Sequence, residues 1–253
     1  MAGVEETNEV PLDLVRDVDL LCLDAGNTVI FLDHDRLASI VTEATGFSVT
    51  AQALVEAEGR AKRLAETGAL RDATWRYRDR PGAIGWGRMV ATIATEGGLD
   101  PEKIPALLDT AWPLHETKNL WCKVPEGLGV ALDAIRARGV KTAIVSNSEG
   151  MLDRLFRDLG IRGHLDILVD SGLVGVEKPD PRIFEIALAE ARVPKERALM
   201  IGDIFATDIA GARAAGIRHA LIDPFGHYEG RHPDVPRVPG TVEVARAILA
   251  QRG

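Results

Sequence analysis

Short apolar runs alternate with helical patterns through the second half of the chain. Runs rich in Val, Ile, Leu and Ala occupy residues 141–146, 165–169, 198–201 and 219–222. Amphipathic stripes with the i, i+3, i+4, i+7 spacing of a helix precede and follow the first run, at Leu128–Ile135 and Leu152–Leu159. An alternation of strands and helices predicts right-handed crossovers, and therefore a parallel sheet with helices on both faces.

A fifth apolar run, residues 18–23, stands apart near the N-terminus. The segment after it, residues 33–122, shows no convincing strand and three amphipathic stripes, Leu37–Ala44, Trp86–Ile93 and Ile104–Trp112. We interpret it as a small helical domain inserted at a loop of the α/β domain, where insertions are best tolerated. The expected organisation is an N-terminal arm (1–16), a discontinuous α/β core (17–32 and 123–253) and a helical domain (33–122).

Composition restricts the class of protein. Hydrophobic residues make up 46% of the 253 residues and charged residues 27%, which is enough apolar material for a packed core. The net charge of −8 disfavours a nucleic-acid partner, and no apolar run approaches the roughly 18 residues that a membrane helix needs. The polar, acidic N-terminus is unlike a secretory signal, and we interpret Cys22 and Cys122, which have apolar neighbours, as buried thiols. We therefore expect a cytoplasmic globular protein.

Polar residues follow the first and second predicted strands of the core. Asp24 ends the run 18–23, and ligands of open parallel sheets bind outside the carboxyl ends of the strands. The alternative is that Asp24 only begins a glycine-containing turn. Ser146 ends the run 141–146 and fits a capping box with Glu149. The same arrangement would present a hydroxyl and free helix N–H groups to a phosphate, so the two interpretations are compatible.

Two later segments carry further charges. Lys178 lies in a loop beside Pro179, which indicates a placed cation, although a loop lysine is more often a solvated surface residue. Asp203 and Asp208 follow the run 198–201 and could be simple helix-terminus charges. If Asp203 lies on a strand next to that of Asp24, the carboxylates crowd one edge of the sheet. An all-oxygen cluster of this kind suits Mg²⁺.

Taken in order, these four segments resemble the motifs of the haloacid dehalogenase-like hydrolase superfamily. The resemblance covers residues 18–250, and its motifs are specific as a set although each is weak alone. It implies a Rossmann-like parallel-sheet core with the first strand at its centre. Many members carry a helical cap inserted just after the first motif, which is where residues 33–122 lie.

The resemblance also implies roles for individual residues. Asp24 would be the nucleophile that forms an aspartyl-phosphate, and the transferred phosphoryl group would be bound by Ser146, Asn147 and Lys178. Mg²⁺ would be held by Asp24, the main-chain carbonyl of Gly26 and Asp203, with support from Asp208. The expected activity is a Mg²⁺-dependent hydrolysis of small phosphate monoesters, with a small phosphorylated molecule as the partner and a substrate that the sequence does not name. The oligomeric state is not predicted.

One position departs from the family pattern. The phosphatases carry a second aspartate two residues after the nucleophile, as general acid and base, and this chain has Gly26 there. Loss of a positioned acid/base costs ~10²- to 10⁴-fold in rate. We therefore expect a slow phosphatase, one specialised for good leaving groups, or one that takes its proton from elsewhere. His34 and His115, close to the ends of the inserted domain, are the candidates for that source.

Three alternatives remain at this stage. A metal-independent 2-haloacid dehalogenase uses the same nucleophile but lacks the spacing of Asp203 and Asp208. Phosphonoacetaldehyde hydrolases have a small residue at the position of Gly26 and use a cap lysine. Lys62 lies in the cap, but its surroundings read as an ordinary charged helix face, which disfavours that assignment. A non-catalytic phosphate-binding or regulatory member of the superfamily is the third.

Overall fold

The computed structural model describes residues 9–253 and contains a six-stranded parallel sheet. The strand order is β5-β4-β1-β6-β7-β8, which places the first strand between β4 and β6. The strands are β1 (Leu20–Leu23), β4 (Lys141–Ser146), β5 (Ile167–Asp170), β6 (Ala198–Gly202), β7 (Arg218–Ile222) and β8 (Arg237–Val238). The predicted α/β fold with a central first strand is confirmed.

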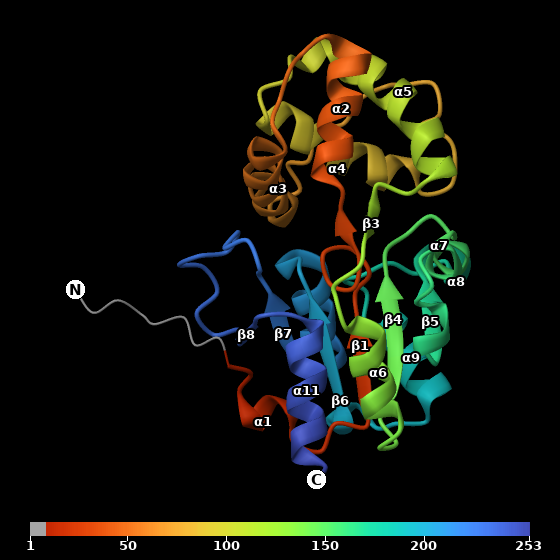
Figure 1. The fold of residues 1–253 in the computed structure, drawn as a ribbon, viewed down its shortest axis with the longest axis vertical. Coiled ribbons are helices and arrows are strands. Elements are labelled where there is room, and N and C mark those ends of the chain that lie inside the picture. Colours follow the sequence, from red (N-terminus) through yellow and green to blue (C-terminus); the bar gives the residue numbers. More distant parts are fainter. Residues whose placement is uncertain (1–8) are drawn as a thin grey trace, which may run out of the picture.

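Helices cover both faces of this sheet (Figure 1). Leu21 and Leu23 of β1 pack on one face, toward α1 (Leu12–Val15), α6 (Leu128–Arg136), α7 (Leu152–Asp158) and α11 (Thr241–Gln251). Leu20 and Cys22 pack on the other, toward α9 (Arg182–Ala191) and α10 (Ala210–Ala215). Successive residues of a strand point to opposite faces, so β1 has to be apolar throughout and not alternating.

The remaining helices lie beyond the carboxyl ends of the strands, at the top of Figure 1. They are α2 (His34–Thr45), α3 (Ala51–Glu66), α4 (Ala83–Glu96) and α5 (Ile104–Thr117), with a 3₁₀ turn η1 (Pro101–Lys103) before α5. They share one cluster of buried side chains that includes Trp75, Trp86 and Trp112. Two short antiparallel strands, β2 (Phe31–Leu32) and β3 (Trp121–Lys123), connect this helical unit to the core.

Short elements complete the chain. They are α8 (Ser171–Val174), the 3₁₀ turns η2 (Arg162–His164) and η3 (Lys195–Arg197), and a π-helical turn η4 (Phe205–Ile209) that follows β6. Among residues 9–253, no helix combines the length and the apolar character needed to cross a bilayer. Of the expected N-terminal arm, residues 1–8 lie outside the described residues, and α1 buries Leu14 and Val15 against the core.

Several elements differ from the sequence prediction. The segment of α3 around Lys62 was expected to be a charged helix face and was not counted among the amphipathic stripes, because charged residues interrupt its apolar stripe. The strand β3 lies at the end of the segment expected to lack strands. The strand β8, two residues between prolines, is too short to show a pattern. The prediction of two buried thiols is wrong for Cys122, which is half-buried because it lies in a two-stranded ribbon and not in a covered sheet. Cys22 is buried, and burial raises the pKa of its thiol to about 12.

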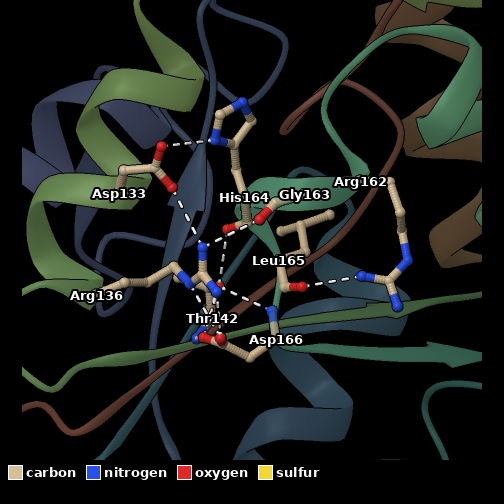
Figure 2. A network of polar contacts seen from close by, with 8 residues as sticks. All are labelled: Asp133, Arg136, Thr142, Arg162, Gly163, His164, Leu165 and Asp166. Atoms are coloured by element: carbon tan, nitrogen blue, oxygen red, sulfur yellow. Dashed lines mark hydrogen bonds and ion pairs between the residues drawn. The ribbon is translucent and has the colours of Figure 1, made fainter.

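A polar network joins residues near the amino ends of β4 and β5, away from the carboxyl ends of these strands (Figure 2). Arg136 of α6 binds Asp166, just before β5, at 2.7 Å, and also binds Asp133. His164 contacts Asp133 as well, while Arg162 donates to the carbonyl oxygen of Leu165. The network joins α6 to the connection that leads into β5, and we assign it a structural role.

The helical unit contacts the core through α3 and the loop after β7. The ring of His227 lies against Gly59, and its Nε2 donates to the carbonyl oxygen of Val55 at 3.1 Å. Arg63 in turn donates to the carbonyl oxygen of His227 at 2.7 Å. Burial, helped by the charge of Lys62, lowers the pKa of His227 to about 4, so the ring is neutral at pH 7. The loop thereby holds α3 over the strand ends.

This close approach gives a stability prediction. A Cβ added at Gly59 would lie 2.5 Å from Cδ2 of His227, so Gly59→Ala should destabilise the protein by about 1 kcal/mol or more by displacing the ring. Gly85 of α4 has open space around it, so Gly85→Ala should stabilise by about 1 kcal/mol, the usual helix-propensity gain. Urea unfolding of both variants measures the difference. Equal effects of the two substitutions would contradict this docking of α3.

Candidate active site

Three buried carboxylates meet at the carboxyl end of the sheet. Asp24 follows β1 and Asp203 follows β6, and these strands pair in parallel with Leu23 opposite Ile201. Asp208 comes from η4, the turn after β6. Each residue offers an oxygen within 4.8 Å of the other two. The strands that precede Asp24 and Asp203 are therefore neighbours in the sheet, as the predicted cluster of carboxylates required.

Lys178 lies among these carboxylates. Its Nζ donates to Oδ1 of Asp24 at 2.5 Å and to Oδ1 of Asp208 at 2.5 Å. Burial alone would lower the pKa of Lys178, but the two carboxylates reverse this effect and raise it, so the ammonium is charged. With 4% of its surface exposed, Lys178 is a placed cation and not a solvated loop residue.

The loops after β4 and before α9 hold each other in register. The side chain of Asn147 donates from Nδ2 to the carbonyl oxygen of Lys178 at 2.9 Å, and its Oδ1 accepts from the Lys178 N–H at 2.7 Å. Ser146 is the last residue of β4, next to β1 in the sheet, and is buried. Asn147 therefore acts on the main chain of Lys178, while Ser146 lies at the same sheet edge as Asp24.

The predicted capping box of Ser146 and Glu149 is wrong. The strand continues through Ser146, and α7 begins only at Leu152, so neither residue stands at a helix N-terminus. The carboxylate of Asp170 accepts the N–H of Leu152 instead. Glu149 lies 2.8 Å from Nε2 of His115, the histidine close to the second end of the inserted domain. The Nδ1 atom of His115 accepts a hydrogen bond from Trp86. Since Nδ1 accepts, Nε2 carries the proton and donates to Glu149.

The carboxylates of the cluster outnumber the ammonium groups that contact them. Burial, together with the charges of Asp24 and Asp208, raises the pKa of Asp203 to about 7. Burial likewise raises the pKa of Asp208 against the opposing effect of Lys178. Oδ2 of Asp203 accepts no well-aligned hydrogen bond from residues 9–253, although an ammonium lies close to it. A buried all-oxygen set with one unsatisfied acceptor fits a hard divalent cation such as Mg²⁺.

That nearby ammonium belongs to Lys62 of α3, and the expectation of an ordinary charged helix face is wrong. Lys62 is 2% exposed, and its Nζ lies 2.6 Å from Oδ2 of Asp203. Glu58, one turn earlier, is also buried and accepts from Asn27 at 2.5 Å and contacts His34 at 2.9 Å. The sequence did contain a signal, because Glu58 and Lys62 fall on the same stripe as the apolar residues of α3, Leu54, Ala57 and Ala61.

The space beside Gly26 is occupied by an aromatic side chain. A Cβ at Gly26 would lie 3.4 Å from Cδ1 of Trp121, which is ordinary contact, and the backbone there does not require glycine. Asp24 Oδ2 would lie 3.9 Å from the same point. Trp121 of β3 thus borders the position where the family's acid/base side chain begins. A cavity of about 620 Å³ lies elsewhere, and the residues that line it include Thr28, Lys123 and Pro239.

Comparison with known proteins identifies relatives of this arrangement. A family model described as haloacid dehalogenase-like hydrolase matches residues 18–216. The mouse haloacid dehalogenase-like hydrolase domain-containing protein 3 is 34% identical over 131 residues, 52% of this chain and 52% of the relative. A phosphoserine phosphatase of Thermus thermophilus is 31% identical over 158 residues, 62% of this chain and 60% of the relative. The alignments span about half the length of the first relatives.

Solved structures with the same fold are more distant in sequence. A putative hydrolase of Bacillus subtilis, described as bound to magnesium with interdomain movement, has a TM-score of 0.62 at 19% identity and covers 92% of this chain and 98% of that one. A 2-haloacid dehalogenase from Pseudomonas syringae pv. Tomato DC3000 has a TM-score of 0.55 at 21% identity, covering 93% and 100%. At these identities the likeness shows the shared fold alone.

The position of Lys178 gives a second prediction. Lys178→Met should destabilise the metal-free protein by about 3–5 kcal/mol, because it leaves two buried carboxylates facing each other without their shared cation. The control is Lys195→Met, the same chemical change at an exposed lysine, which should cost less than about 0.5 kcal/mol. Urea unfolding with a chelator present measures both. A loss at Lys178 no larger than that at Lys195 would show that the ammonium does not neutralise the cluster.

Proposed function

The chain belongs to the haloacid dehalogenase-like hydrolases, and from this premise we propose that it hydrolyses small phosphate monoesters through an aspartyl-phosphate on Asp24. The observation that carries the proposal is the buried carboxylate of Asp24, held by Lys178 beside two further carboxylates at the strand ends. Relatives named as phosphoserine and phosphoglycolate phosphatases support a phosphorylated substrate.

In this reaction Asp24 acts as the nucleophile. Lys178 contacts its Oδ1 and holds the carboxylate in place. A new bond from a carboxylate oxygen of Asp24 to phosphorus forms as the ester oxygen leaves with its electron pair and takes up a proton. Water then attacks phosphorus and gives up a proton as the bond between phosphorus and Asp24 breaks, which releases orthophosphate and restores the carboxylate. Lys178 neutralises charge on the phosphoryl oxygens, the Ser146 hydroxyl binds one of them, and Asn147 keeps Lys178 in place.

Asp24, Asp203 and the main-chain carbonyl of Gly26 would hold Mg²⁺, with Asp208 in support. The all-oxygen donor set and the unsatisfied Oδ2 of Asp203 favour this assignment. When bound, the ion would supply positive charge against the oxygens of the phosphoryl group. Lys178 is the cation that the chain itself provides to Asp24.

Proton transfer lacks the usual carboxylate in the proposed reaction. Gly26 offers no carboxylate, and Trp121 borders the space where one would begin. His34 is the substitute that we propose, because Glu58 orients its ring, and Glu58 also binds Asn27 of the loop that carries Asp24. A base placed on a different element, instead of two residues from the nucleophile, is expected to be less effective, so turnover should be slow.

A metal-independent 2-haloacid dehalogenase is the second candidate. It is favoured by one observation, that Lys62 and Lys178 already pair with the three carboxylates. A non-catalytic phosphate-binding or regulatory member is favoured by Gly26. Phosphate release from a monoester panel with and without Mg²⁺, halide release from 2-haloacids, and binding without turnover separate the three functions.

We propose that residues 33–122 form a cap domain that selects the substrate. The position of the inserted helices beyond the carboxyl ends of the strands (Figure 1) and the contact of Lys62 with Asp203 support this proposal. We also propose a cytoplasmic enzyme whose partner is a small phosphorylated molecule and not a nucleic acid, in keeping with the net charge of −8.

Removal of the nucleophile gives the third prediction. Asp24→Asn keeps the shape of the side chain but removes its charge, so hydrolysis of an aryl phosphate should fall by about 10³-fold or more. Asp180→Asn, at an exposed aspartate two residues from Lys178, is the control and should retain full activity. A chelator should abolish activity, and Mg²⁺ should restore it. Full activity in Asp24→Asn, or in chelator, would rule out the proposed mechanism.

The absent acid/base gives the fourth prediction. A good aryl phosphate should release about one equivalent of phenol per site in a burst, followed by a slower steady rate, because dephosphorylation lacks a close base. Gly26→Asp should abolish the burst and raise the steady rate, and the ordinary contacts at Gly26 leave room for the added Cβ. Stopped-flow absorbance measures both phases.

The control for that experiment is Gly26→Ala, which adds the Cβ without the carboxylate. It should leave the burst unchanged. Absence of a burst in the parent, together with no gain from Gly26→Asp, would mean that another group already transfers the proton at full efficiency. His34→Gln would then be expected to create the burst.

A further inference from the structure

Lys62 is a buried cation that the hydrolase mechanism above does not use. It extends from α3 of the helical unit into the core, where its Nζ lies 2.6 Å from Oδ2 of Asp203. Its side chain is 3% exposed, as is that of Asp203, so water does not screen the pair. A lysine from an inserted unit thus contacts an oxygen of the core's acidic cluster.

Glu58 adds a second negative charge near this ammonium. It lies one turn before Lys62 on α3, and it is anchored to the core by Asn27, whose Nδ2 donates to it at 2.5 Å. Burial alone would lower the pKa of Lys62, but Asp203 and Glu58 reverse this effect and raise it. At Glu58, burial alone would raise the pKa of the carboxyl group, but Lys62 and His34 outweigh this effect and lower it.

The contact with Asp203 is close but poorly aligned. Although the two atoms are 2.6 Å apart, Oδ2 of Asp203 accepts no hydrogen bond that meets ordinary angular limits within the described residues. A divalent ion on that oxygen would lie about 2.0–2.1 Å from it if the ion were Mg²⁺. An ammonium and a dication cannot share one oxygen at these distances without strong repulsion, because the site excludes water.

We propose that Lys62 competes with the divalent cation for Oδ2 of Asp203, so that the ion binds this oxygen only after the ammonium has left it. This inference rests on the metal site of the proposed function. Lys62 neutralises the cluster while the metal is absent, and metal entry displaces its ammonium from Asp203. The contact between Lys62 of α3 and Asp203 of the core therefore depends on whether the metal is bound.

The test is metal binding by the full-length chain, with Mn²⁺ as the probe because its free ion can be counted by electron paramagnetic resonance. Lys62→Met removes the ammonium and keeps most of the side-chain volume, so it should tighten Mn²⁺ binding by about tenfold or more. Arg63→Met is the matched control. Arg63 also joins α3 to the core, through the carbonyl oxygen of His227, but it does not touch the carboxylates. Its Kd should change less than about twofold.

The outcomes are distinct. Unchanged or weaker binding in Lys62→Met would overturn the competition, and an equal gain in Arg63→Met would assign the effect to loosening of α3 instead. Binding of Mn²⁺ by neither the parent nor Lys62→Met would overturn this inference together with the metal part of the proposed function. Binding that is equal in the two would overturn the inference alone.

A second measurement needs no variant. Acetylation of the parent with an amine-selective reagent, read by peptide mass spectrometry, should modify Lys62 several-fold faster when Mg²⁺ is added, because displacement from Asp203 frees its ammonium. The exposed Lys195 should react at the same rate with and without Mg²⁺. Labelling of Lys62 that is unchanged or slowed by Mg²⁺ would overturn the proposal.

Discussion

Three carboxylates, Asp24, Asp203 and Asp208, lie within 4.8 Å of one another at one end of the sheet with almost no contact with water. Like charges in a buried site are unfavourable unless cations accompany them. Lys178 meets this requirement for Asp24 and Asp208, and its main chain is in turn fixed by Asn147. The geometry of the site depends on this neutralisation.

The fold explains why the charges gather there. In a parallel sheet every strand delivers its carboxyl end to the same edge, so residues distant in sequence converge when β1 lies between β4 and β6. The inserted helices cover that edge (Figure 1). The helix α3 adds Glu58 and Lys62, so the inserted unit contributes charged side chains to the site.

Much of this architecture could be predicted from the sequence, since five apolar runs and the polar residues after them follow the pattern of a parallel α/β sheet. Asp24, Lys178 and the pair Asp203 and Asp208 could be singled out because each stands directly after a strand or in a short loop. The burial of Glu58 and Lys62 was missed although both fall on the apolar stripe of α3, because a charge on a helix is normally solvated and the docking of α3 onto the core is not visible in the sequence. The false capping box of Ser146 arose because a strand end and a helix start share the same residue types.

The central claim is that Asp24 carries the phosphoryl group during turnover. The direct measurement is to quench the enzyme in acid during steady turnover of a good aryl phosphate and to locate the adduct by peptide mass spectrometry. The account predicts a phosphoryl group on the Asp24 carboxylate in a large fraction of molecules, since its hydrolysis lacks a close base. An unmodified Asp24 during turnover, or a phosphoryl group on another residue, would contradict it.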